Sequence, residues 1–299
     1  MKDHPFDKDA LNTLLYWIKE REAIRMKHDA KKPLPWTGDV ILQKYRFCCV
    51  DRNDDTVTQW IHNYWLHKYS GDKDLWFAMV VARLLNLPSS LAAVQKDVFN
   101  KSGVRFNPNG FMNVLDARKA SGPIFNGAYI VSTNGHAMDK VKYITERVLE
   151  PLWEFRVNIR PTDGDSLHTF HERLTKYDGL GSFMAAQVVG DIKYDKSGPL
   201  AEAIDWRTWA ASGPGSRRGM NRLFGRLAIA PYKESVWRYD METLYGVIHN
   251  LSETKLGVRK EKLTAQNLQN CLCEFDKYMR TINGEGKPKQ MYKPAPWQV

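Results

Sequence analysis

A short turn with two glycines, "YDGLGS", is the first part of this sequence whose residue types could do chemistry. Apolar periodicity over 166–177 and over 182–192 predicts a helix on each side of the turn. Gly179 and Gly181 permit turn conformations and a close backbone approach that a Cβ would hinder. The backbone N–H groups of the turn and of Ser182 could then bind a DNA phosphate without reading sequence. The alternative is an ordinary helical hairpin with a glycine C-cap.

The segment "GPGSRRGMNRL" combines three glycines with three arginines. Glycines let backbone amides approach an anion, and guanidinium groups bind phosphate in a bidentate way. The anion could be a DNA phosphate, a phosphorylated or glycosylated base substituent, or a pyrophosphate leaving group, and a basic, solvated helix start is the alternative. The predicted phosphate-binding residues here are Gly213, Gly215, Ser216, Arg217, Arg218 and Arg222.

Aromatic and polar residues in "YRFCCVDRNDD" and "GAYIVSTNG" form the candidate wall of a base pocket. Chemistry on a base inside a duplex requires extrusion of that base into a pocket. The alternatives are structural, since Asp54 and Asp55 would cap a helix and Arg52 would form a salt bridge, while Ser132 and Asn134 would cap a later helix. The predicted pocket residues are Tyr45, Phe47, Asp51, Arg52, Asn53, Ser132 and Asn134.

Helical periodicity dominates the elements that must position these residues. After a first helix marked by residues 11–18, the predicted helices cover residues 57–65, 73–86, 135–150, 166–177, 182–192, 216–228, 237–250 and 263–281. Only residues 127–133 are typical of a strand. The segments "KKPLPWTGD", "FNPNG", "SGPIFNG" and "RPTDGDS" predict breaks. The pattern indicates an all-α, mainly helical and two-lobed protein.

The composition, with 43% hydrophobic and 26% charged residues, indicates a soluble globular protein. Without an apolar run near the roughly 18 residues of a membrane span, or a secretion signal, we expect a cytoplasmic protein. The net charge of +10 indicates a polyanionic partner, because clustered Lys and Arg release counterions from phosphates. Cys48, Cys49, Cys271 and Cys273 lack Cys-x-x-Cys spacing, so free thiols are expected, with a composite four-cysteine metal site as the alternative.

The hairpin followed by "AIDWRTW" resembles the helix-hairpin-helix DNA glycosylase superfamily. The blocks "KPLPWTGDVILQKYRFCCVDRNDDTVTQWI", "GAYIVSTNG", "GLGSFMAAQVVGDI", "GPGSRRGMNRL" and "LQNCLCEFDKYMR" are similar, within it, to the alpha-glutamyl/putrescinyl thymine pyrophosphorylase family, including the helical region associated with hydroxymethyluracil DNA kinases. This resemblance implies an N-terminal helical lobe (1–160), a catalytic helix-hairpin-helix lobe (161–250), and a C-terminal helix and basic tail (251–299) that pack on the N-terminal lobe.

The superfamily resemblance also implies a catalytic role for Asp205, 24 residues after Gly181. Its carboxylate would stabilise the positive charge on a deoxyribose as the base departs, and would orient or deprotonate the attacking water. A structural or N-cap aspartate is the alternative. Where lyase members of the superfamily carry a nucleophilic lysine, this chain has Phe183, which implies cleavage of the base alone.

Three functions compete at this point. The favoured hypothesis is a monofunctional DNA glycosylase that flips out and excises a hypermodified pyrimidine, with phage defence as its expected role. The alternatives are a transferase that replaces pyrophosphate on a thymine methyl group with an amine, and a noncatalytic DNA-binding module. A kinase role for this chain alone is not expected, because its sequence has no Gly-x-x-x-x-Gly-Lys-Ser/Thr loop. The expected partner is double-stranded DNA with modified bases, bound by a monomer without cofactor or metal.

Overall fold

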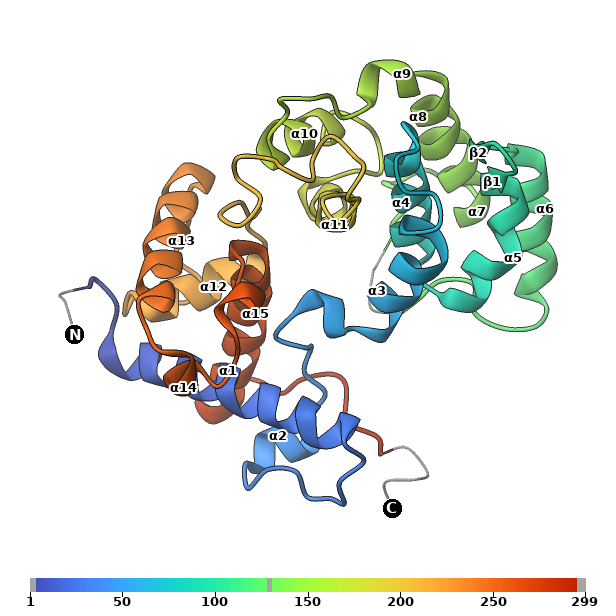
Figure 1. The fold of residues 1–299 in the computed structure, drawn as a ribbon. Coiled ribbons are helices and arrows are strands. Elements are labelled where there is room, and N and C mark those ends of the chain that lie inside the picture. Colours follow the sequence, from blue (N-terminus) through green and yellow to red (C-terminus); the bar gives the residue numbers. More distant parts are fainter. Residues whose placement is uncertain (1–3, 128–130, 295–299) are drawn as a thin grey trace. The chain divides into compact units, whose positions relative to one another are not determined.

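The computed structural model describes residues 4–127 and 131–294 and is mainly helical, which confirms the predicted class (Figure 1). Two compact units make up the chain. Unit 1 comprises Met1–Asp55 and Arg207–Val299, and unit 2 comprises Thr56–Trp206. Among the described residues, no helix is long and apolar enough to cross a membrane.

Unit 1 is built around α15 (Ala265–Ile282), which packs against α1 (Lys8–Asp29), α12 (Pro214–Leu223) and α13 (Glu234–His249). The buried face of α15 carries an apolar stripe at helical spacing, as its sequence predicts. This stripe includes Leu268, Leu272 and Phe275. The remaining elements of unit 1 are α2 (Val40–Lys44), α14 (Glu253–Leu256) and the 3-10 helices η1 (Arg52–Asp54) and η4 (Lys260–Lys262). The first and last helices of the chain therefore share one core.

Unit 2 is built around α4 (Leu75–Leu85), in which all 11 residues are buried. A helix that is apolar on every side belongs in a core, and α4 packs against α5 (Pro88–Val98) and α11 (Ser182–Ile192). The remaining elements are α3 (Thr56–Ile61), the π-helices η2 (His62–Leu66) and η3 (Ile144–Leu149), α6 (Pro108–Lys119), α7 (Lys140–Tyr143), α8 (Glu150–Glu154), α9 (Arg156–Ile159), α10 (Leu167–Leu174), and an antiparallel pair, β1 (Phe99–Asn100) and β2 (Gly103–Val104).

Among the boundaries that differ from the sequence prediction, two have a clear local reason. The predicted break at "FNPNG" is the start of α6, where the Asn107 side chain accepts a hydrogen bond from the Gly110 N–H and Pro108 occupies the first turn. The helix predicted to end at residue 228 ends at Leu223, because the chain turns at Gly225 with a φ of +63°.

The predicted strand at 127–133 falls largely on residues 128–130, which lie outside the described residues. Residues 131–133 on its far side are not strand.

The chain passes from unit 1 to unit 2 between residues 55 and 56 and returns to unit 1 between residues 206 and 207. The sequence instead predicts boundaries at 160 and 250. The N-terminal 55 residues belong to unit 1 because α1 packs on α15 and α12. The segments 1–160, 161–250 and 251–299 stay a prediction about how functions divide along the chain.

Candidate nucleic-acid interface

The hairpin between α10 and α11 turns at Gly179, as the glycine pattern predicts. Its φ is +76°, and a Cβ built there would lie 2.6 Å from a methyl carbon of Val148. A side chain at this position would therefore meet both backbone strain and a steric clash. Leu180 is buried in the turn, whereas Gly181 and Ser182 are exposed.

The N-terminus of α11 could bind an anion, because its N-cap residue, Gly181, provides no side-chain acceptor for the first N–H groups. The first N–H groups of a helix have no partner within the helix, and an anion at this end would accept their hydrogen bonds. The carbonyl oxygen of Ser182 lies 3.0 Å from the Nε2 of His171, which ties this end of α11 to α10.

The opposite end of α11 is held by a buried charge network that sequence reasoning missed. Asp191 lies 2.5 Å from both the Nε and the Nη2 of Arg83, and 3.2 Å from the Nε2 of His62. Arg83 also donates hydrogen bonds to Thr58 and Asn86. Because a buried charge must be paired, this network fixes α11 against α4. The only signal in the sequence was an arginine within an otherwise apolar helix.

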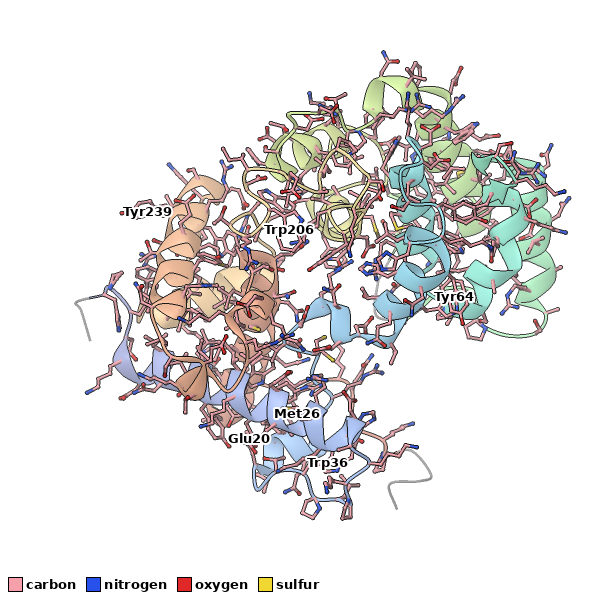
Figure 2. All side chains as sticks on the ribbon, in the orientation of Figure 1. Glu20, Met26, Trp36, Tyr64, Trp206 and Tyr239 are labelled. Carbon is pink, nitrogen blue, oxygen red and sulfur yellow. The ribbon has the colours of Figure 1, made fainter. Side chains whose placement is uncertain are left out.

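Asp205 contacts the start of a helix in unit 2. Its two carboxylate oxygens accept hydrogen bonds from the N–H groups of Leu167, at 2.7 Å, and His168, at 3.0 Å, in the first turn of α10. This contact is structural, as one alternative from the sequence allowed, but the N-cap residue of α10 is Ser166. The neighbouring Trp206, which Figure 2 labels, donates its indole N–H to the carbonyl oxygen of Lys193 at 2.9 Å.

The glycines of "GPGSRRGMNRL" bring α12 close to α15. A Cβ at Gly219 would lie 2.3 Å from the carbonyl oxygen of Leu272, and one at Gly215 would lie 3.0 Å from the Sγ of Cys273. The Ser216 hydroxyl is buried and bonds to the backbone of Gly213. These glycines therefore serve helix packing in unit 1, a use that the sequence pattern does not distinguish from anion binding.

Two arginines of the same segment, Arg218 and Arg222, contact one buried carboxylate that the sequence pattern did not indicate. Asp276 is fully buried and accepts from Arg218 Nε at 2.7 Å and Arg222 Nε at 3.0 Å, while Arg280 Nε lies 3.4 Å away. The two terminal nitrogens of Arg222 donate hydrogen bonds to Glu285. The side chains of Arg218 and Arg280 are 33% and 36% exposed, so part of each guanidinium stays accessible.

Arg217 is paired elsewhere, since its Nη2 lies 2.9 Å from Glu234 and its Nε donates to Ser212 at 2.7 Å. Burial raises the pKa of Glu234, but hydrogen bonds from Ser212 and Arg217 outweigh it and leave the pKa below its ordinary value. Glu234 is thus an anion at neutral pH and competes with phosphate for Arg217.

The predicted base-pocket residues of unit 1 are mainly structural in their contacts. Tyr45 and Phe47 are buried in the core. Asp51 accepts hydrogen bonds from the N–H of Asn53 and the side chain of Asn267, and burial raises its pKa. Asn267 also accepts from the N–H of Arg52, so it ties this loop to α15. Asn267 lies far away in sequence, which is why no local pattern indicated it.

The two predicted base-pocket residues of unit 2, Ser132 and Asn134, are exposed. The Ser132 hydroxyl donates to the Asn134 side chain at 2.9 Å, and the Asn134 amide donates to Tyr143 at 2.8 Å. Neither residue caps α7, because its N-cap is Asp139. Ser132 and Asn134 therefore form a small polar surface whose role in base binding stays a prediction.

All four cysteines are free thiols. Burial raises the pKa of Cys273 to about 12, and the Glu274 carboxylate raises that of Cys48 above its ordinary value. Protonated thiols are poor nucleophiles and poor metal ligands. Within residues 4–127 and 131–294, no group of three or more His, Cys, Asp or Glu side chains could hold a metal ion.

Comparison with known proteins identifies the family. Residues 8–287 match the model described as "5-hmdU DNA kinase, helical domain", so the chain belongs to this family. It is 27% identical over 277 residues to the 5-hmdU DNA kinase of Bacillus phage SP10, a match that covers 83% of this chain and 41% of the relative. The chain thus spans less than half the length of that relative. No solved structure matches it.

These matches correct the function expected from sequence. The family and the phage relative are named for a kinase, a phosphotransferase, so the prediction of an N-glycosylase that flips out and hydrolyses a base is wrong. The amine-transfer alternative shares the idea of group transfer but is a different reaction. The glycosylase prediction rested on the interval between the hairpin and Asp205. The Asp205 oxygens accept hydrogen bonds at the start of α10, and a catalytic role for this residue stays a prediction.

Proposed function

We propose that this chain is the DNA-recognition part of a system that phosphorylates 5-hydroxymethyluracil in double-stranded DNA. The family match over residues 8–287 carries this proposal, because it covers the helical domain of a DNA kinase. The excess of basic over acidic residues supports the proposal, since a net charge of +10 favours a polyanionic partner. Phosphoryl transfer itself falls to a nucleotide-binding module that works with this helical part.

The proposed architecture is that of the helix-hairpin-helix superfamily, used for binding rather than for base excision. Support comes from α10, the tight turn at Gly179 and the uncapped start of α11. The buried pair of Asp191 and Arg83 would keep α11 rigid while its N-terminus contacts a phosphate. A contact of this kind binds the DNA backbone without distinguishing one base sequence from another.

A second phosphate contact is proposed at the arginine cluster of unit 1. Asp276 engages Arg218 and Arg280 on their Nε side. In the described part of the chain, neither arginine forms an ion pair with another carboxylate. Their remaining N–H groups could therefore bind a phosphate in the bidentate way that guanidinium favours. Of the predicted phosphate-binding residues, Arg217 and Arg222 are the less suitable, because Glu234 and Glu285 occupy them.

Substitution of Gly181 by Asp tests the hairpin contact without weakening the fold. A Cβ at Gly181 meets no atom within 4 Å, and an aspartate N-cap should stabilise α11. The same carboxylate would repel a DNA phosphate. Fluorescence anisotropy with a duplex that contains 5-hydroxymethyluracil should show at least tenfold weaker binding and a shallower dependence on salt.

The matched control is Gly246→Asp, which makes the same charge change in the interior of α13, where a Cβ also meets no atom within 4 Å. Its affinity for the duplex should stay within about twofold of the parent protein. Equal losses in the two variants would mean that only total charge matters and would contradict the hairpin contact. Arg218→Gln and Arg280→Gln test the second contact in the same assay.

A further inference from the structure

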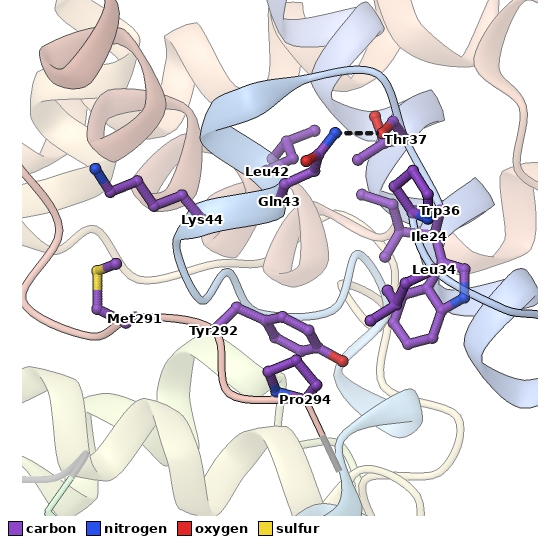
Figure 3. A pocket seen from close by; sticks show the side chains of 11 residues that line it. Ile24, Leu34, Trp36, Thr37, Leu42, Gln43, Lys44, Met291, Tyr292 and Pro294 are labelled. Atoms are coloured by element: carbon purple, nitrogen blue, oxygen red, sulfur yellow. Dashed lines mark hydrogen bonds between the residues drawn. The ribbon is translucent and has the colours of Figure 1, made fainter. Parts of the chain in front are cut away.

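Unit 1 contains a cavity of about 320 Å³ that none of the phosphate contacts above involves. It lies between the segment Leu34–Thr37, helix α2 and the segment Met291–Pro294 (Figure 3). Trp36 and Leu42 are nearly fully buried and form its deep part, whereas Leu34 and Met291 are partly exposed at its edge. The volume lies at the lower end of the range for small-molecule sites, about 300–1,000 Å³.

The walls of the cavity are aromatic and held in place. The ring centroids of Trp36 and Tyr292 are 6.1 Å apart with an interplanar angle of 62°. The indole N–H of Trp36 donates to the carbonyl oxygen of Lys32 at 2.8 Å, so the indole has only its apolar surface to offer a ligand. The backbone N–H of Tyr292 donates to the carbonyl oxygen of Lys44 at 3.0 Å, which fixes the opposite wall. This lining suits a flat, apolar-faced ring.

One polar group gives the cavity a hydrogen-bonding preference. The amide nitrogen of Gln43 donates to the carbonyl oxygen of Thr37 at 2.7 Å (Figure 3). That bond fixes the orientation of the amide. In the part of the chain that the structure describes, the Oε1 of Gln43 accepts no hydrogen bond. A ring with an N–H at its edge would satisfy this acceptor, as nucleobases do.

The charged residue of the cavity lining is Lys44. Lys32 and Lys293 are exposed residues close in sequence to the lining residues Leu34 and Tyr292. A ring ligand that carries a phosphate would gain from these ammonium groups. Aromatic walls, the amide acceptor of Gln43 and a lysine in the lining are together the chemistry that suits a nucleotide.

We propose that this cavity binds the base of a nucleotide, with the phosphate at Lys44. The same chemistry could come from a free nucleotide or from an unpaired base of single-stranded DNA. Either source would give the chain a nucleotide-binding site separate from the duplex-phosphate contacts proposed for the hairpin and the arginine cluster.

Isothermal titration calorimetry with thymidine, thymidine 5′-monophosphate and a short oligothymidylate tests the proposal. We expect saturable binding of the monophosphate, weaker binding of the nucleoside, and at least a tenfold loss in Tyr292→Ala, since stacking contributes about 1–3 kcal/mol per base. Leu34→Trp should abolish binding because the larger side chain fills the cavity from its edge. Lys44→Gln should weaken the binding of the monophosphate and leave the affinity for the nucleoside unchanged.

The control is Tyr239→Ala, which removes a 70% exposed aromatic ring from α13 in the same unit (Figure 2). It should bind like the parent protein. Saturable binding of the oligonucleotide alone would assign the cavity to single-stranded DNA, and binding of the monophosphate would assign it to free nucleotides. No binding of any probe at millimolar concentration, or equal binding in Leu34→Trp, would overturn the proposal. Duplex binding should be unchanged in Leu34→Trp, so this test and that of the hairpin can fail separately.

Discussion

Asp191 and Arg83 form a bidentate ion pair inside unit 2, with both N···O distances at 2.5 Å and neither side chain more than 1% exposed. Asp191 belongs to α11, the second helix of the hairpin, and Arg83 to α4, the central helix of the unit. The pair therefore connects the proposed phosphate-binding turn to the core.

Loss of one partner of this pair should be costly. Asp191→Asn would leave the Arg83 guanidinium buried without a counter-charge, and we expect a loss of about 3–5 kcal/mol in the free energy of unfolding. Urea denaturation followed by circular dichroism measures it. The double variant Arg83→Met/Asp191→Leu should lose less, because no charge stays buried. A double variant as unstable as the single one would contradict the electrostatic explanation.

Asp205 should stabilise the start of α10. Asp205→Ala removes the acceptor of two N–H groups at the start of α10, and a loss of about 0.5–2 kcal/mol in unfolding free energy is expected. Thermal denaturation measures this loss, with the exposed Asp163→Ala as the control. Duplex affinity of the folded variant should stay close to that of the parent protein. A stable Asp205→Ala protein would show that the two hydrogen bonds contribute nothing.

Local sequence patterns predicted α11 with its observed bounds, 182–192, because a glycine turn marks its start and its apolar period is regular. The pair of Asp191 and Arg83 could not be predicted in this way. Its members are 108 residues apart, and the position of Arg83 within an apolar helix does not identify its partner. Burial is a property of the packed helices, which no single segment encodes.

The structural contacts of the glycines and arginines of 213–223 could not be predicted for a related reason, and their phosphate binding stays a prediction. Glycine allows close approach of a ligand and of another helix alike, and only the position of Leu272 beside Gly219 decides between them. Likewise, Arg218 and Arg222 donate hydrogen bonds to the buried Asp276, which lies more than 50 residues away in sequence.

Acid should weaken unit 1 partly through Glu285. A hydrogen bond from Arg222 lowers the pKa of this glutamate from 4.5 to about 2. A carboxylate whose pKa is lowered on folding stabilises the protein above its ordinary pKa, and this contribution is lost as the pH falls from about 4.5 towards 2. The pair is partly exposed, so its contribution is at most about 1 kcal/mol.

Glu285→Gln tests this contribution through the difference in unfolding free energy from the parent protein. The difference should be present at pH 6 and should shrink between pH 5 and pH 2. Glu242→Gln, an exposed change on α13, serves as the control and should show a smaller difference. A difference for Glu285→Gln that is constant over this pH range would contradict the assignment.

Gly219 should tolerate no side chain. A Cβ there would lie 2.3 Å from the carbonyl oxygen of Leu272, a backbone atom of α15 that can move only with its helix. We expect Gly219→Ala to cost about 1–3 kcal/mol in unfolding free energy, as overpacked cores do. Gly213→Ala is the matched control from the same segment, since its Cβ would come no closer than 3.8 Å to the Gln269 side chain. Denaturation of both variants in urea gives the comparison, and equal stability of the two would mean that α12 and α15 are not closely packed at Gly219.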